Sequence, residues 1–118
     1  MKILIVDDED ELSRMLKRYL KTKGFSDVIT INTPEAAIQY IELNKPDFVF
    51  LDINLNTKLN GIDVLKQVHR TTPETLICMV SAYRDEHEQQ SLAEGAKWFL
   101  RKPTTLDDLL AILKSAGQ

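Results

Sequence analysis

The fold of this chain is decided by the stretch Phe48-Val49-Phe50-Leu51-Asp52-Ile53-Asn54, in which four apolar residues are followed directly by a carboxylate. A buried parallel strand has this pattern when it surfaces with a charge at its carboxyl end. Asp52 is therefore expected at the tip of a strand. Ligands of open α/β sheets bind in the crevice outside the carboxyl ends of the strands. A functional site is expected here if other strand ends bring reactive groups to the same edge.

The composition predicts a single globular domain over residues 1–118. A chain of 118 residues buries about two-thirds of its unfolded surface, and 43% apolar with 28% charged residues is typical of globular proteins. The formal net charge of −3 argues against nucleic-acid binding, which requires a basic face. The single cysteine, Cys78, lies in an apolar run, which excludes disulfides and cysteine-ligated metals. The apolar run at 3–6 is too short for a signal peptide or a membrane span, so we expect a cytoplasmic protein without membrane contact.

Short apolar runs alternate with helical segments along the whole chain. Strands are predicted at 2–6, 28–31, 47–52, 75–80 and 97–100. Helices are predicted to begin near Leu12, at Pro34, after Gly61, at Arg84 and after Thr105. The segment 84–94 has almost no apolar face, so we expect the core to hold this fourth helix weakly.

This alternation predicts an α/β fold of the (βα)5 type, a doubly wound five-stranded parallel sheet with helices on both faces. Strand order does not follow from the pattern itself. The flavodoxin-like order 2-1-3-4-5 is the common solution for five such units, and it places the switch point between the first and third strands.

With this order, polar residues from four strands meet at the carboxyl edge of the sheet. They are Asp7 and Asp8 after the first strand, Asp52, Ser81 and Lys102. Each has an ordinary structural explanation by itself. Asp8 and Ser81 can cap helices, Asp52 can be a turn residue, and a surface lysine is usually solvated. Only their convergence at one edge favours a functional site.

The chemistry of the converging groups favours phosphoryl transfer. Three nearby carboxylates repel each other unless a cation is present. The available ligands are carboxylate oxygens, waters and a backbone carbonyl, for which Asn54 is well placed, and this set suits Mg²⁺ or Mn²⁺. Lys102 adds a positive charge and Ser81 a hydroxyl donor. Asp52 in this setting is a candidate nucleophile that would form an aspartyl phosphate.

Four motifs carry a resemblance that covers essentially the whole chain. They are Ile3-Leu4-Ile5-Val6-Asp7-Asp8-Glu9, Leu51-Asp52-Ile53-Asn54, Val80-Ser81-Ala82 and Gly95-Ala96-Lys97-Trp98-Phe99-Leu100-Arg101-Lys102-Pro103. Each is weak by itself, but all four in this order and at these spacings are highly specific. The chain resembles the receiver domain of two-component response regulators.

The resemblance implies a role for each site residue. Asp52 accepts a phosphoryl group from a phosphohistidine of a sensor histidine kinase or a phosphotransfer protein. Asp7, Asp8 and Asp52 hold Mg²⁺ together with the Asn54 carbonyl, and Ser81 and Lys102 bind the phosphoryl oxygens. Phe99 is the aromatic switch residue, and the peptide bond between Lys102 and Pro103 is expected to be cis. Ala82 and Tyr83 follow Ser81, and Tyr83 and Asn54 stand where the family tunes phosphoryl lifetime.

The resemblance also implies a switch rather than a turnover enzyme. Phosphorylation changes the surface of helix four, strand five and helix five, which contacts an effector domain, a target protein or, on phosphorylation, a second copy of the chain. No effector domain is expected within 1–118, and no direct nucleic-acid binding by this domain. An excised receiver and a stand-alone one both remain open.

Some positions depart from the family pattern. Asn56 stands where proline is frequent, Gly61 lies nine residues after Asp52 instead of eight, and Thr104 replaces a frequent aromatic. The loop after Asp52 is therefore expected to be one residue longer. Trp98 stands where small or polar residues are usual, either packed on helix five or exposed to a partner.

Two other classes of protein compete with this interpretation. A small phosphohydrolase of the haloacid-dehalogenase type also uses a strand-end aspartate, Mg²⁺ and a lysine, but it requires a second aspartate where this chain has Asn54. A flavodoxin-like cofactor binder would need a phosphate-binding loop after the first strand. The four acidic residues at 7–10 would repel a phosphate there.

Overall fold

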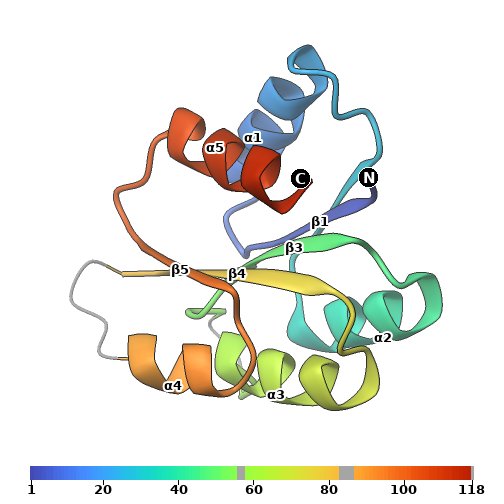
Figure 1. Cartoon of the computed structure of the whole chain (residues 1–118), viewed down its shortest axis with the longest axis vertical. Coiled ribbons are helices and arrows are strands. Elements are labelled where there is room, and N and C mark those ends of the chain that lie inside the picture. Colours follow the sequence, from blue (N-terminus) through green and yellow to red (C-terminus); the bar gives the residue numbers. More distant parts are fainter. Residues whose placement is uncertain (56–57, 83–86, 118) are drawn as a thin grey trace.

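The computed structural model describes residues 1–55, 58–82 and 87–117, and within them five strands alternate with five helices (Figure 1). The strands are β1 (Ile3–Val6), β2 (Val28–Ile31), β3 (Phe48–Asp52), β4 (Leu76–Ser81) and β5 (Trp98–Arg101). The helices are α1 (Asp10–Thr22), α2 (Pro34–Asn44), α3 (Gly61–Thr71), α4 (Glu88–Ala93) and α5 (Leu106–Ala116). Each strand lies within a residue or two of its predicted range.

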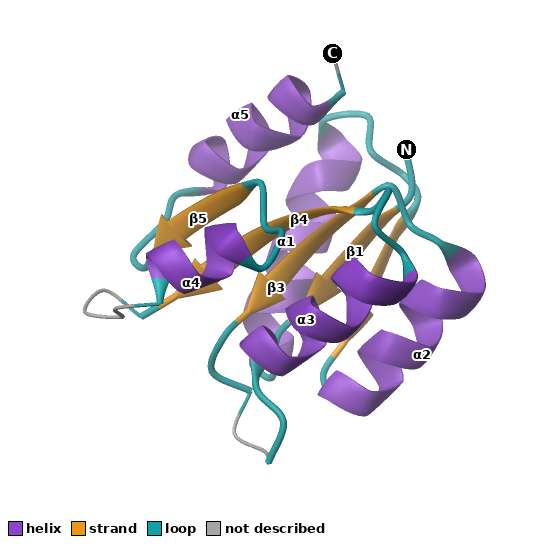
Figure 2. Cartoon of the chain, turned by 60° about the horizontal axis from the view of Figure 1, so that its bottom comes forward, coloured by secondary structure: helices purple, strands orange, loops and turns teal. Residues whose placement is uncertain are grey.

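The sheet is entirely parallel, and its strand order is β2-β1-β3-β4-β5. This confirms the predicted fold class and order. Helices α1 and α5 cover one face of the sheet, and α2, α3 and α4 cover the other (Figures 1 and 2). The strand register places Asp52 opposite Val80 of β4, so the carboxyl ends of the central strands lie at one edge.

The two faces of the sheet belong to two separate apolar clusters, because side chains alternate along a strand. Ile3, Ile5, Phe48 and Phe50 pack with α1 and α5, whereas Leu4, Val6, Val49 and Leu51 pack with α2 and α3. All five residues of β3 are buried, as a run without polar alternation predicts for a central parallel strand.

Side chains at the predicted starts of three helices satisfy the first free amide groups of the backbone. Thr33 accepts from the amide of Ala36 ahead of Pro34, which begins α2 as predicted. Capping boxes begin α3 and α5, with Thr105 and Asp108 forming the one at α5. Helix α1 differs, because its N-cap is Glu9 and no side chain bonds there, so Asp8 is not the cap.

Helix α4 is shorter in the described structure than the predicted segment 84–94. It runs from Glu88 to Ala93, and residues 84–86 lie outside the described residues. Ser91 is the one buried position in this helix. The weak apolar anchoring expected of this helix is therefore present.

Trp98 is packed rather than presented to solvent. Its ring lies 5.5 Å from that of Phe48, centroid to centroid, and it joins the cluster formed with α1 and α5. Of the two alternatives, the structure favours packing on the α5 side of the sheet.

Candidate functional site

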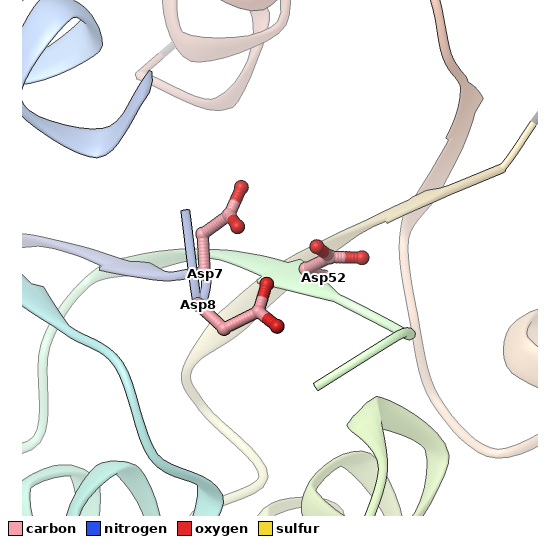
Figure 3. Close-up of side chains that lie close together, drawn as sticks. All are labelled: Asp7, Asp8 and Asp52. Carbon is pink, nitrogen blue, oxygen red and sulfur yellow. The ribbon is translucent and has the colours of Figure 1, made fainter. Parts of the chain in front are cut away.

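The candidate site lies at the carboxyl edge of the sheet, where the first and third strands meet. Asp7 and Asp8 follow β1 directly, and Asp52 is the last residue of β3, next to β1 in the sheet. Their three carboxylates lie side by side (Figure 3), with one oxygen of each within 4.8 Å of the others. The predicted convergence of these three residues is therefore present.

Burial and charge crowding make this cluster electrostatically unfavourable without a cation. Asp52 is only 3% exposed, and Asp7 and Asp8 are half-buried. Burial, with a smaller contribution from the charge of Asp52, raises the pKa of Asp7 from 3.8 to about 6, although the amide of Glu9 opposes the shift by donating to its Oδ1. A divalent cation would relieve this repulsion.

The donor set fits magnesium. All three groups offer carboxylate oxygens, the ligands that hard divalent cations prefer, and neither a thiolate nor an imidazole lies among them. Asp7, Asp8 and Asp52 would hold the ion, and the backbone after Asp52 is the nearest source of a carbonyl ligand. The receiver family generally binds Mg²⁺ at such an acidic cluster.

Lys102 supplies the positive charge of the site from the far end of β5. Its Nζ lies 3.2 Å from Oδ2 of Asp52 and 3.8 Å from a carboxylate oxygen of Glu9. Burial alone would lower the pKa of Lys102, but the charge of Asp52, with smaller contributions from Asp7 and Glu9, raises it above its ordinary value. The ammonium group is therefore held in its charged form beside Asp52.

The backbone after β3 holds Asp52 from the other side. The amide of Asn54 donates to Oδ1 of Asp52 at 3.0 Å, so the two carboxylate oxygens have different partners. The amide of Gly61 donates to the carbonyl of Ile53 at 2.9 Å, which brings the start of α3 against this turn. Asn56, the departure from the family pattern, lies outside the described residues.

Ser81 ends β4 and is fully buried. Its hydroxyl donates to the carbonyl of Ala82 at 3.3 Å, and its own carbonyl accepts from the amide of Lys102 at 2.7 Å. Ala82 is exposed, and Tyr83 lies outside the described residues. The structure thus links the ends of β4 and β5 through backbone atoms of two predicted site residues.

Two further predicted positions lie on or just after β5. Phe99 is half-buried against the cluster on the α2–α3 side of the sheet. The peptide bond between Lys102 and Pro103 is cis. Pro103 is exposed and is one of the residues that line a cavity beside Asp52 and Lys102.

Sequence reasoning missed two features of the site. Glu9 belongs to the acidic motif after β1, and in the structure its carboxylate contacts Lys102 and its backbone amide donates to Oδ1 of Asp7. Leu12 and Met15 belong to the apolar stripe of α1, but they are 46% and 49% exposed. Both line a cavity of about 360 Å³ between α1 and α5 that reaches Asp52 and Lys102. Helical periodicity indicates one apolar stripe, but only packing decides which part of it is covered.

The chain matches the family model described as the response regulator receiver domain over residues 3–114. The alkaline phosphatase synthesis transcriptional regulatory protein PhoP of Bacillus subtilis is 36% identical over 115 residues, which cover 97% of this chain and 47% of PhoP. The nitrogen assimilation regulatory protein NtrX of Azorhizobium caulinodans is 33% identical over 97% of this chain and 25% of its own length. The chain thus spans about half or a quarter of these curated relatives.

Solved structures of receiver domains have the same fold as this chain. The receiver domain of NtrX from Brucella abortus has a TM-score of 0.89 with 29% identity, over 98% of this chain and 97% of that one. A response regulator receiver domain protein from Clostridium thermocellum has a TM-score of 0.90, also with 29% identity, over 98% of this chain and 92% of that one. In the described part of the chain, every helix is too short or too polar to cross a membrane.

Proposed function

Because this chain belongs to the receiver-domain family of two-component response regulators, we propose that Asp52 is its phosphoacceptor and that phosphorylation switches the surface of α4, β5 and α5. The observation that carries the proposal is the setting of Asp52. It is a buried carboxylate at the carboxyl end of β3, with Lys102 at 3.2 Å and two more carboxylates within 4.8 Å. A carboxylate in such a setting is suited to act as a nucleophile toward phosphorus.

The reaction transfers a phosphoryl group from a histidine to Asp52. A carboxylate oxygen of Asp52 attacks the phosphorus of a phosphohistidine of a sensor kinase or phosphotransfer protein. The bond from phosphorus to the imidazole nitrogen breaks as the bond from phosphorus to oxygen forms, and the imidazole leaves with the bonding electron pair. No atom changes its oxidation state in this transfer, so neither an oxidant nor a reductant is needed.

Asp7, Asp8, Asp52 and the Asn54 carbonyl would hold Mg²⁺ during this transfer, with Mn²⁺ as a substitute. When bound there, the ion supplies positive charge that offsets the charge of the phosphoryl oxygens. Lys102 donates to the oxygen that faces β5, exchanging its present contact with Asp52 for one with the phosphoryl group. Most of the catalysis by these residues is positioning and charge stabilisation.

Ser81 converts the chemical change into a conformational one. Its hydroxyl donates to the carbonyl of Ala82 in this structure. A phosphoryl group on Asp52 offers a stronger, charged acceptor. A move of the hydroxyl toward it draws the end of β4 and Ala82 along, and Phe99 fills the space left on the neighbouring strand. The weakly anchored α4 then shifts, and Tyr83 and Asn54 tune how long the phosphoryl group survives.

The partners follow from the switch. A histidine kinase or phosphotransfer protein contacts the edge around Asp52. An effector domain, a target protein or a second copy of the chain contacts α4, β5 and α5. Residues 1–118 act as one receiver domain in the cytoplasm, as a signalling switch rather than a turnover enzyme, and do not bind nucleic acid directly.

Acetyl phosphate with Mg²⁺, followed by intact-mass measurement, tests the proposal. The wild-type chain should gain one phosphoryl mass, and Asp52→Ala should gain none. Asp27→Ala is the matched control, because Asp27 is an exposed aspartate ahead of β2, away from the site, and this variant should behave as wild type.

Two outcomes would contradict the proposal. One is equal phosphoryl gain by Asp52→Ala and wild type, which would place the acceptor elsewhere. The other is sustained release of phosphate from a phosphomonoester such as p-nitrophenyl phosphate, because a receiver domain holds its phosphoryl group on one carboxylate whereas a hydrolase of the haloacid-dehalogenase type turns over.

A further inference from the structure

The guanidinium of Arg101 joins two parts of the fold that the switch must separate. Its Nη1 lies 2.6 Å from a carboxylate oxygen of Glu88, in the first turn of α4. Its Cζ lies 5.1 Å from the centroid of the Phe99 ring, which is a cation–π contact. Phe99 and Arg101 are two residues apart in β5, so both side chains lie on the same face of the sheet. One side chain therefore contacts both the aromatic residue and the helix.

Helix α4 has few other anchors to the sheet. Ser91 is its one buried residue, and the hydroxyl of Ser91 has no hydrogen-bond partner among the described residues. A buried hydroxyl without a partner opposes packing instead of favouring it. Leu92, the leucine of this helix, is 43% exposed. The ion pair with Arg101 is thus one of the contacts that join α4 to β5, which lie side by side (Figure 2).

Arg101 is also next to the candidate site in the chain. It is paired in register with Ser81, and the following residue, Lys102, donates its amide to the Ser81 carbonyl and its ammonium group to Asp52. A change in charge at Asp52 can therefore displace Arg101 in two ways. A movement of Lys102 acts through the peptide bond that joins the two residues, and a movement of Ser81 acts through its pairing with Arg101 in the sheet.

We propose that Arg101 is a positioning residue that latches the resting arrangement, holding Phe99 under its guanidinium and α4 through Glu88. The proposal rests on the function proposed above and names a regulator of the same site. Phosphorylation must break the latch for α4 to shift and for the ring of Phe99 to move. Loosening the latch raises the fraction of unphosphorylated protein in the switched arrangement.

The solvent exposure of the Arg101–Glu88 ion pair limits how strongly it can favour the resting arrangement. The side chains of Arg101 and Glu88 are 40% and 42% exposed, so water and salt screen their attraction. The ion pair and the ring contact together should bias the equilibrium by about two- to fivefold. If the switched arrangement is the one that accepts a phosphoryl group, the rate of phosphorylation rises by the same factor.

The test measures phosphorylation of the full chain by acetyl phosphate at saturating Mg²⁺, using intact mass against time. Arg101→Gln, which removes both contacts, should gain phosphoryl mass about two- to fivefold faster than wild type. Glu88→Gln, which removes the ion pair and leaves the ring contact, should also be faster than wild type but no faster than Arg101→Gln. The double variant should be no faster than the faster single one, because both changes break one contact. Arg101→Lys keeps the charge but loses the planar stack, so its rate should lie between those of wild type and Arg101→Gln.

Two matched control variants each remove one charge of the same sign nearby but leave the contacts of Arg101 intact. Lys97→Gln removes a positive charge just before β5, and Glu94→Gln removes a negative charge at the end of α4. Both should phosphorylate at the wild-type rate. Rates of Arg101→Gln and Glu88→Gln that equal those of these controls, or effects that multiply in the double variant, would overturn the latch while the proposed function stands.

A second measurement does not depend on phosphorylation. Backbone amide resonances of α4 and of Phe99 in unphosphorylated Arg101→Gln should shift toward their positions in wild type saturated with beryllofluoride and Mg²⁺. Resonances that stay at the wild-type resting positions overturn the latch. A wild type that neither gains phosphoryl mass nor responds to beryllofluoride overturns the proposed function, and the latch with it.

Discussion

At the scale of a single residue, Asp7 shows what burial does to a carboxyl group that lies beside another carboxylate, Asp52. Burial, and then the charge of Asp52, raises its pKa from 3.8 to about 6 in the metal-free protein. A carboxyl group with a higher pKa in the folded state stabilises the fold fully below about pH 4, and this contribution is lost as the pH rises through about 6. A divalent cation bound at the cluster must displace the same proton.

The affinity for Mg²⁺ should therefore decrease as the pH is lowered through about 6. Isothermal titration calorimetry should give a Kd about tenfold weaker at about pH 5 than at about pH 7.5, because a group with a pKa of about 6 is mostly protonated at the lower pH. Asp7→Asn should bind weakly at both pH values and should raise the Tm of the metal-free protein at about pH 7.5. Equal wild-type affinities at the two pH values would contradict the role of Asp7.

At the scale of the element, the connection between β3 and α3 positions Asp52. Gly61, the first residue of α3, lies so close to this strand end that a Cβ there would be 2.4 Å from the Asp52 carbonyl oxygen and 2.6 Å from the Ile53 Cα. Both are backbone atoms, which cannot turn away as a flexible side chain would. A glycine is therefore required here by close approach and not by an unusual φ angle.

Gly61→Ala should lower the free energy of unfolding by about 2 kcal/mol or more, because the β3 end must shift to admit a methyl group. Urea denaturation measures this loss, and phosphoryl gain at Asp52 should slow in the same variant. Gly24→Ala is the comparison. A Cβ at Gly24 meets nothing within 4 Å, so the substitution there costs only the strain of its positive φ of +95°, about 1 kcal/mol. Equal losses in both variants would refute the close-approach argument.

At the scale of the whole molecule, α1 and α5 leave an apolar cavity open beside Asp52. Leu12 and Met15 line this cavity of about 360 Å³, which ends at Asp52 and Lys102, and they are about half exposed. A protein that brings a phosphohistidine to Asp52 must cover the rim of this cavity. A small phosphodonor has no such contact. The two kinds of donor should therefore depend differently on these side chains.

The double substitution Leu12→Ser with Met15→Ser should slow phosphotransfer from a cognate phosphohistidine protein by about tenfold, since it removes exposed apolar surface that this protein would bury on binding. Phosphorylation by acetyl phosphate should stay within about twofold of wild type. Leu43→Ser is the control, because Leu43 is 76% exposed on α2. Equal slowing with both donors would show that the substitutions damage the site itself.

Much of the fold could be predicted because its signals are local. The buried run that ends at Asp52, the proline after Thr33 and the cap at Thr105 depend on residues within a few positions of each other, and all three are present in the structure. The residues of the acidic cluster were also predictable. Parallel strands bring their carboxyl ends to one edge whatever the side chains around them.

The remaining features depend on segments far apart in the sequence. The exposure of Leu12 and Met15 is set by how far α5 covers α1. The contacts of Arg101 join Phe99 of β5 to Glu88 of α4. No spacing of residues in the sequence indicates that these side chains meet. Glu9 lies in a run of consecutive acidic residues in the sequence, and only folding brings Lys102 beside it.

By itself, the sequence determined an α/β chain of five repeating units with its carboxylates, hydroxyl and ammonium group at strand ends, because hydrophobic periodicity and strand polarity are properties of consecutive residues. Only the tertiary structure decided the raised pKa of Asp7, the cavity beside Asp52 and the ion pair between Arg101 and Glu88 of α4. Burial and electrostatic energies depend on distances between residues that the chain brings together only on folding.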